Sequence, residues 1–287
     1  MDNLKGMAWM TLAMLAFALT DMLIILIAEA LPIGQILALF GIGGAGLFGI
    51  WAHIQGQHWI SPVLLMRPVM IRNVAEVLAT VFFVTALSLI PLSTLSSVIQ
   101  ANPLLVTLGA ALFLGEQVGW RRWTAICAGL FGVMLILQPG TEGFDTNILF
   151  AVLAAVGLSL RDLATRLVPK SIPATLLSSY SFASVALAGG MLMPVTGGAV
   201  MPGAVIWGYV GAGVLMGMVA YFAITEAMRT GDISVVTPFR YTRLVFAFVI
   251  AVFVFDEKIA PLTLAGLGIV VATGLYSLWR ETRARPD

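Results

Sequence analysis

Ten apolar stretches, each long enough to cross a lipid bilayer, dominate this sequence. Crossing a hydrocarbon core of about 30 Å as an α-helix takes about 20 mainly apolar residues. Glycines, prolines and charge clusters separate the stretches and set their bounds. The predicted spans are 6–28, 33–51, 69–89, 92–114, 120–138, 147–167, 174–194, 204–229, 233–255 and 260–279. The sequence therefore predicts an all-α integral membrane protein with ten transmembrane helices.

Composition supports this class and excludes others. Of the 287 residues, 60% are hydrophobic and 10% are charged, whereas soluble domains carry about 25% charged residues. The net charge of +1 leaves no basic surface that indicates nucleic-acid binding. The single cysteine, Cys127, excludes an intramolecular disulfide and is expected to be buried and inert. Because no cysteine or acid cluster lies beside His53 or His58, no metal or cofactor site is predicted.

Lysine and arginine predict the orientation, because cytoplasmic loops near span ends carry an excess of both. With both termini inside, twelve of them fall at cytoplasmic ends and only Lys258 at an outer end. The twelve are Lys5, Arg67, Arg72, Arg121, Arg122, Arg161, Arg166, Lys170, Arg229, Arg280, Arg283 and Arg285. We expect Arg72 to extend its charge to the cytoplasmic interface. The N-terminal stretch "MDNLKGMAWM" has no cleavage site, which favours a first span over a signal peptide. The prediction is a multi-pass protein of the inner (plasma) membrane.

Internal repetition divides the chain into two halves. A shift of 141 residues aligns five pairs of residues and also maps span one onto span six and span four onto span nine. The pairs are Asp21 with Asp162, Pro32 with Pro173, Ala86 with Ala227, Ser93 with Ser234, and Glu116 with Glu257. Five spans per half is an odd number, so the second half must enter the membrane upside down. Residues 1–140 and 141–287 are therefore predicted to form inverted repeats, an arrangement common in secondary transporters.

Polar residues inside the spans are the candidate functional residues, since an intramembrane charge is costly. Asp21 lies in an otherwise apolar run, and Gln100 and Asn102 precede Pro103 in the fourth span. The 141-shifted partners of Gln100 and Asn102 are Tyr241 and Arg243, which follow Pro238. Pro103 and Pro238 are predicted hinges, because each removes a backbone hydrogen bond. The Arg243 guanidinium suits a substrate carboxylate. Alternatively, Gln100 and Asn102 only hold helices together.

The third span supplies opposite charge and a polar neighbour. Glu76 lies one turn beyond Arg72, with Asn73 on the same face. We expect Glu76 to pair with Arg240 or Arg243, either at the transport pathway or as a plain structural ion pair. If protons are coupled to transport, Asp21 and Glu76 are the candidate carriers, because burial favours a protonated carboxyl.

Aromatic residues and glycines complete the list of candidates. A few aromatic side chains must line any central path, although such residues more often face lipid or the core. The candidates are Phe17, Phe82, Phe83, Tyr221, Phe222 and Tyr241. The glycine-rich runs at 41–49 and 208–217 predict close helix contacts.

The chain resembles a known transporter superfamily. The two five-span halves, "LGE" at 114–116, "FDE" at 255–257 and "TPFRYTRLVF" at 237–246 are similar to the drug/metabolite transporter superfamily, in particular its EamA-type members. Within it, the YddG-like amino-acid exporters are most similar. The resemblance implies export of aromatic and other neutral amino acids, and roles for Glu116 and Glu257 as helix-boundary caps. The stretch "ALTD" at 18–21 departs from the family's Trp-Gly-Ser-Asn-like stretch.

The predicted function is a secondary transporter that binds a small metabolite in a central cavity and alternates access between the two membrane faces. Export of other metabolites or drugs is the nearest alternative, and a channel or non-transporting scaffold is an alternative of another class. An intramembrane enzyme is disfavoured, because the chain has no Ser/His constellation, no adjacent aspartates and no cofactor motif. No nucleotide-binding motif appears, so gradients would drive transport.

The charge bias predicts the membrane topology. Reporter domains fused after residue 55 or at the C-terminus should read as cytoplasmic, and reporters inserted at 140–147 should read as external. An external C-terminus would contradict the ten-span arrangement.

Overall fold

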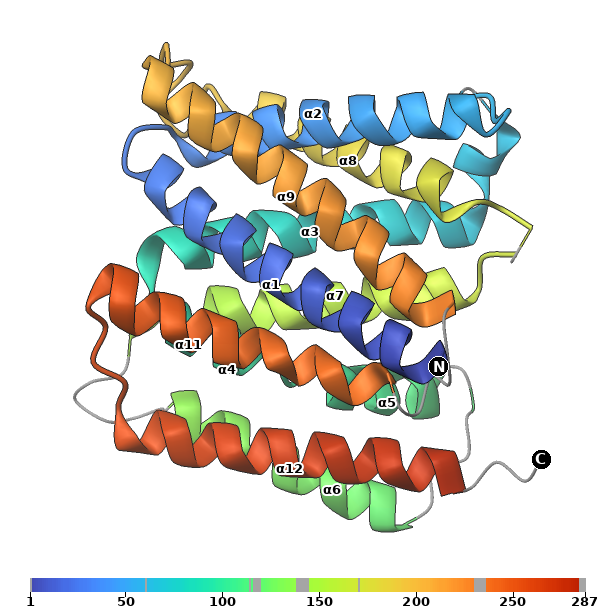
Figure 1. Ribbon diagram of the computed structural model, residues 1–287, viewed down its shortest axis with the longest axis vertical. Helices are drawn as coiled ribbons and strands as arrows, with labels where there is room; N and C mark the ends of the chain where they lie inside the picture. The colour runs from blue at the N-terminus through green and yellow to red at the C-terminus, as the bar shows by residue number, and fades with distance from the viewer. Residues whose placement is uncertain are drawn as a thin grey trace.

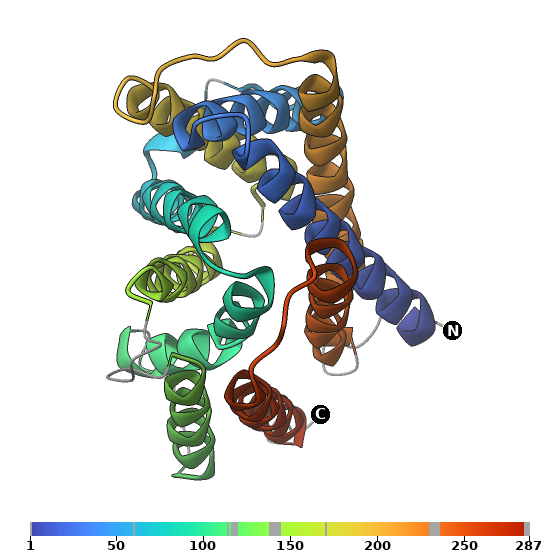
Figure 2. The same cartoon turned by 90° about the vertical axis from the view of Figure 1, so that its left-hand side faces the viewer.

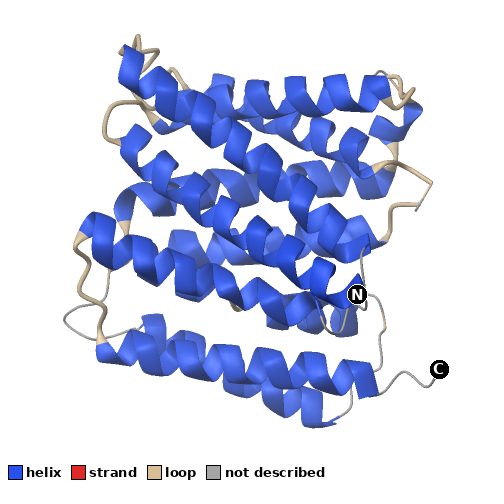
Figure 3. Ribbon diagram, viewed as in Figure 1, coloured by secondary structure: helices blue, strands red, loops and turns tan. Residues whose placement is uncertain are grey.

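The computed structural model describes residues 2–59, 61–113, 115, 120–137, 145–169, 171–229 and 236–283. Every element in these ranges is helical (Figure 3). The first half contains α1 (Asp2–Ala28), α2 (Ile33–Ile54), η1 (Pro62–Leu65), α3 (Arg67–Leu89), α4 (Leu92–Ile99), α5 (Asn102–Phe113) and α6 (Trp120–Leu137). The second contains α7 (Ile148–Arg166), α8 (Ala174–Leu192), α9 (Ala204–Arg229), η2 (Thr237–Tyr241), α11 (Thr242–Phe255) and α12 (Pro261–Arg283).

These helices match the ten predicted spans, with two breaks. The fourth span consists of α4 and α5, which separate at Gln100 and Ala101, and Pro103 stands in the first turn of α5. The described part of the ninth span begins as the short 3₁₀ helix η2, with Pro238 in its first turn, and continues as α11. Within the described residues, seven helices are long and apolar enough to cross a membrane. Both breaks therefore lie beside the prolines at which hinges are predicted.

The helices lie side by side and stack along the long axis of the molecule. In Figure 1 the stack runs from α2 and α8 at the top to α6 and α12 at the bottom. Seen from the side in Figure 2, α1, α9 and α11 lie in one layer and α3, α7 and α5 in another. Within these layers α1 packs along α9 and α3 packs along α7.

The helix contacts follow the internal repeat. A shift of 141 residues carries α1 onto α7 and α3 onto α9, so it exchanges the α1–α9 and α3–α7 contacts. The same shift carries α2 onto α8 and α6 onto α12, and each of these helices packs against its own equivalent. The sequence repeat is therefore also a repeat of packing.

Glycines allow the α2–α8 contact to be close. A Cβ atom on Gly41 would lie 2.4 Å from the backbone nitrogen of Ala186, and one on Gly189 would lie 2.3 Å from the backbone nitrogen of Ala38. Neither distance leaves room for a side chain, as expected where small residues let helix backbones approach in lipid. In α9, by contrast, added Cβ atoms on Gly208, Gly211 and Gly217 would meet open space, so the predicted close contact is wrong for those positions.

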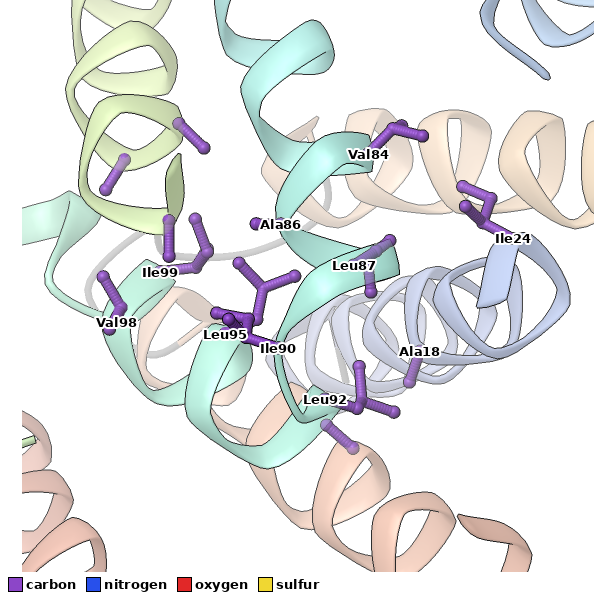
Figure 4. Packing of buried hydrophobic residues seen from close by; sticks show 14 of the residues in the cluster. Ala18, Ile24, Val84, Ala86, Leu87, Ile90, Leu92, Leu95, Val98 and Ile99 are labelled. Carbon is purple, nitrogen blue, oxygen red and sulfur yellow. The ribbon is translucent and has the colours of Figure 1, made fainter. Parts of the chain in front are cut away.

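The largest buried apolar cluster draws on helices of both halves, and one part of it lies where α3 turns into α4 and meets α1. Figure 4 shows Leu87, Ile90 and Leu92 grouped beside Ala18 of α1. Ile90 and Pro91 form the short connection between α3 and α4, and Pro91 is the N-cap residue of α4. This packing fixes the start of the broken fourth span. Cys127, predicted to be buried, is instead exposed on α6, where a bilayer would surround it.

Glu257, just beyond the end of α11, caps α4 in the other half of the chain. Its Oε1 accepts a hydrogen bond from the Leu92 backbone N–H (2.7 Å), and its Oε2 accepts one from the Ser93 N–H (3.1 Å) and one from the Ser93 hydroxyl (2.6 Å). Three otherwise unpaired donors at a helix start are thereby satisfied. The predicted capping role is confirmed for Glu257, although the capped helix belongs to the other repeat. Glu116 lies outside the described residues.

Removing the Glu257 carboxylate should loosen this end of α4. We expect Glu257→Ala to lower the unfolding free energy by about 1 kcal/mol, the usual effect of losing a helix cap. The midpoint of thermal unfolding in detergent measures the effect. Glu29→Gln changes an exposed acid and should leave the midpoint unchanged. An equal shift in both variants would contradict a specific cap.

Candidate functional site

A cavity of about 260 Å³ lies between the layers, and residues from both halves line it. Its apolar wall includes five phenylalanines, which are Phe17, Phe40, Phe48, Phe83 and Phe182. Its polar wall includes Asp21, Glu76, Gln100, Asn102, Arg161, Tyr221, Arg240, Tyr241 and Arg243. Both breaks in the spans reach it, because Gln100 and Pro103 line it from one half and Arg240 and Tyr241 from the other. Irregular backbone at membrane depth is tolerated where it lines such a cavity.

Most of the residues predicted to lie on the pathway line this cavity, but Asn73, Phe82 and Phe222 do not. Asn73 is buried, and its Oδ1 accepts a hydrogen bond from the Ser181 hydroxyl (3.2 Å). Phe82 packs against Phe150, with ring centroids 6.2 Å apart. Pro238 lies in η2, and its side chain is not described. Position on the third span was therefore a poor guide to which face of α3 meets the cavity.

Asp21 pairs with Arg243. Arg243 Nη2 donates a hydrogen bond to Asp21 Oδ2 at 2.7 Å, and only 4% of the Asp21 side chain is exposed. The guanidinium also lies over the rings of Phe17 (5.3 Å) and Phe83 (5.7 Å), where cation–π attraction stabilises it. The expected pairing of Glu76 with Arg240 or Arg243 is not the one observed, because α11 packs on α1 whereas α3 packs on α7.

Glu76 pairs instead with Arg161, which joins two acids. Arg161 Nη1 lies 3.5 Å from Glu76 Oε1, and Arg161 Nη2 lies 2.8 Å from Asp162 Oδ1. Sequence reasoning missed Arg161, because an arginine five residues before the end of α7 also fits a loop-facing charge. The neighbouring Asp162 is the repeat equivalent of Asp21, and this could have indicated that Arg161 also lies inside the bundle.

Asp162 has a second partner that reproduces the Asp21 contact. Asn102 Nδ2 donates to Asp162 Oδ2 at 3.1 Å, and the Ser159 hydroxyl donates to Asn102 Oδ1 at 2.6 Å. Shifting Asp21 and Arg243 by 141 residues in opposite directions gives Asp162 and Asn102. Each half therefore uses an aspartate to hold the equivalent residue of a broken span, with an arginine in one case and an asparagine in the other.

Arg72 is buried and does not reach the interface. It is 7% exposed, and it donates to Thr165 Oγ1 (3.1 Å), to the Leu177 carbonyl (3.0 Å) and to the Ser181 hydroxyl. The expectation that it extends to the cytoplasmic interface is wrong, because oxygen atoms on α7 and α8 accept the hydrogen bonds of the guanidinium inside the bundle. Arg72 ties α3 to these helices.

Two residues that line the cavity each have a buried polar atom without a hydrogen-bond partner in the described part of the chain: Gln100 Nε2 and Tyr241 Oη. Each residue is only 8% exposed. Buried polar groups are nearly always paired, and an orphaned one calls for an explanation. Gln100 and Tyr241 are equivalent under the 141-residue shift, so the two breaks present donors from matching positions.

A second cavity of about 400 Å³ adjoins the first near the end of α2 and the start of α8. Phe48 and Tyr221 line both cavities, so their rings stand between them. Phe182 contacts both rings, with centroids 5.7 Å from Phe48 and 5.5 Å from Tyr221. These three rings, named here the aromatic partition, separate the central cavity from the cavity beside Gln55 and Pro173.

The Asp21–Arg243 pair predicts a pattern of double substitution. Arg243→Gln or Asp21→Asn alone should cost about 3–5 kcal/mol of stability or sharply reduce folded yield, because each leaves a buried charge unpaired. The double variant removes both charges and should recover much of the yield. Size-exclusion profiles of detergent extracts measure it. Combining Arg243→Gln with Glu76→Gln should give no recovery, and recovery there would contradict the observed pairing.

Comparisons with known proteins agree with this architecture. A solved crystal structure superposes with a TM-score of 0.62 over 97% of this chain and 98% of its own, at 19% identity, which shows a shared fold alone. A riboflavin transporter of Rhizobium johnstonii is 27% identical over 302 residues, covering 97% of this chain and 92% of its own.

A further relative and a family match complete the comparison. The S-adenosylmethionine uptake transporter of Rickettsia felis is 27% identical over 205 residues, covering 69% of this chain and 67% of its own. The EamA-like transporter family matches residues 4–138 and 146–278, which correspond to the two halves. With its helices, its repeat of packing and its cavity, the chain belongs to the EamA-like transporter family, a family of membrane transporters and not of enzymes.

Proposed function

We propose that this protein is a secondary transporter that moves a small metabolite, carrying a planar ring and a polar head, through the central cavity by alternating access. The observation that carries the proposal is the cavity where two broken spans from the two halves meet. There, aromatic rings stand beside paired charges. Transporters commonly place their substrate between repeats, at discontinuous helices near the membrane midplane.

The two halves are proposed to be inverted repeats, with residues 1–140 and 141–287 rocking against each other. The exchange of the α1–α9 and α3–α7 contacts under one shift supports this relation. The breaks at Pro103 and Pro238 are proposed hinges, since backbone without a regular helical ladder bends at low cost. Both termini are proposed to lie in the cytoplasm, with the protein in the inner (plasma) membrane.

The substrate class follows from the wall of the cavity. Five phenylalanines, Tyr221 and Tyr241 offer ring faces, while arginines and carboxylates offer polar contacts. S-adenosylmethionine and riboflavin, named for two relatives, both combine a fused ring with polar groups. Aromatic amino acids share that design. These two relatives are named for substrates other than amino acids, so amino-acid export is proposed as one member of the class.

The aromatic partition is proposed as the gate between the central cavity and the cavity beside Gln55. A substrate that passes from one to the other must displace the rings of Phe48 and Tyr221, which line both. Protons are proposed coupling ions, because the carboxylates of Asp21 and Glu76 face the central cavity. A channel would need a continuous path, which these rings interrupt.

Exchange in liposomes tests the proposed function. Purified protein is reconstituted with unlabelled riboflavin, S-adenosylmethionine or tryptophan inside, and uptake of the same labelled compound is followed without ATP. We expect saturable counterflow with at least one compound, and a dependence on an imposed pH gradient if protons are coupled. Non-saturating flux would indicate a channel, and no flux with any such compound would contradict the proposal.

A glycine beside the partition supplies a matched pair of variants. A Cβ atom on Gly44 would lie 2.4 Å from the Phe182 ring, whereas one on Gly46 would meet nothing within 4 Å. Gly44→Ala should displace the ring and reduce exchange about fivefold or more, since overpacking costs about 1–3 kcal/mol. Gly46→Ala should leave exchange unchanged. Equal exchange rates in the two variants would contradict a role of Phe182 in the gate.

A further inference from the structure

The arginines near the central cavity differ in whether a partner holds them. Arg243 is paired with Asp21, and Arg161 with Glu76 and Asp162. Arg72 donates to hydroxyl and carbonyl oxygens of α7 and α8. Arg240 lines the cavity but makes no ion pair or hydrogen bond with any residue that the structure describes. Arg240 is therefore the cavity cation whose donors are available to a ligand.

The charges around the cavity sum to a positive excess. Among the residues that line it, three arginines (Arg161, Arg240 and Arg243) stand beside two acids (Asp21 and Glu76). Asp162 interacts electrostatically with Arg240 but directs its hydrogen bonds to Arg161 and Asn102. A guanidinium without a counter-charge in a low-dielectric cavity is costly, and a bound anion would relieve that cost.

The neighbours of Arg240 in the cavity wall add donors of the same kind. Tyr241 follows it directly, and Tyr241 Oη is buried without a partner in the described part of the protein. Gln100 Nε2, from the other broken span, is in the same state. An amide N–H, a phenol O–H and a guanidinium all donate hydrogen bonds, and a carboxylate accepts up to about four. The three groups thus match an oxyanion in both charge and hydrogen bonding.

Resting on the proposed function, we propose that Arg240, with Gln100 Nε2 and Tyr241 Oη, binds the carboxylate of the transported metabolite. The carboxylate completes the hydrogen bonding of both orphaned atoms and supplies the missing counter-charge. The ring of the substrate then lies on the phenylalanine wall. An amino group on the same substrate finds Glu76, whose contact with Arg161 is long at 3.5 Å. In this proposal Arg243, which is already paired with Asp21, has a structural role.

Ring-matched ligands test this assignment on the purified, full-length protein. Tryptophan and indole-3-propionate carry a carboxylate, whereas tryptamine lacks one, and adenosine with adenosine 5′-monophosphate provides a phosphate pair. Affinities are measured by isothermal titration in detergent. We expect the protein to prefer the carboxylate members. Arg240→Gln should weaken their binding about 10- to 100-fold, the range for losing hydrogen bonds to a charged group, and change tryptamine binding less than threefold.

Controls separate this effect from general damage. Arg67→Gln removes an exposed arginine at the start of α3 and should leave all affinities unchanged. Tyr241→Phe keeps the ring and removes one donor, so it should weaken carboxylate binding several-fold even if Arg240→Gln fails to fold. Equal losses for tryptophan and tryptamine would overturn the assignment. So would a loss confined to adenosine 5′-monophosphate, which would point to phosphate.

The outcome for the carboxylate site is distinguishable from that for transport itself. Saturable counterflow at the same rate with and without a carboxylate on the substrate would support the transporter function and contradict the role of Arg240. If the protein shows no counterflow with any ring-bearing metabolite, the proposed function fails before the carboxylate is considered.

Discussion

The structure depends on one constraint of an apolar solvent: inside a bilayer, backbone N–H and C=O groups must find partners within the protein. Continuous helices meet this requirement over most of the chain. The fourth and ninth spans do not, because they break at Gln100 and Ala101 and within η2. Such breaks are stable only where protein or a water-filled cavity covers the freed groups. Both breaks lie on the central cavity, so the constraint that shapes the helices also locates the site.

Buried charge imposes the second constraint. An arginine in hydrocarbon needs a counter-charge or a dense set of acceptors, and the bundle supplies one or the other for Arg243, Arg161 and Arg72. The pairs also join helices that are far apart in sequence. Asp21 and Arg243 link α1 to α11, while Glu76 and Arg161 link α3 to α7. Against this background Arg240 is informative, because it lines the cavity and has no counter-charge or acceptor bonded to it among the described residues. A ligand could supply one.

The repeat explains why matching residues of the two halves face one cavity, and its departures make that cavity asymmetric. Asp21 and Asp162 hold the equivalent positions 243 and 102, where one half has arginine and the other asparagine. Gln100 and Tyr241 are likewise equivalent in place but different in chemistry. A symmetric scaffold supports rocking motion, whereas a substrate with two different ends needs walls that differ.

The sequence by itself determined the helices, their approximate ends and the repeat, because apolar length, proline and a fixed offset are local or one-dimensional signals. It also marked Asp21, Gln100, Tyr241 and Arg243 as candidates, since each is polar within an apolar run, and all four line the cavity. Only the tertiary structure decided which charge meets which. Pairing depends on which helix faces pack together. Helices with similar apolar surfaces can pack in many arrangements that bury nearly equal area, so the sequence alone does not select one. Thus Glu76 meets Arg161 and not Arg243, Arg72 turns inward, and Arg240 lines the cavity without an ion pair among the described residues.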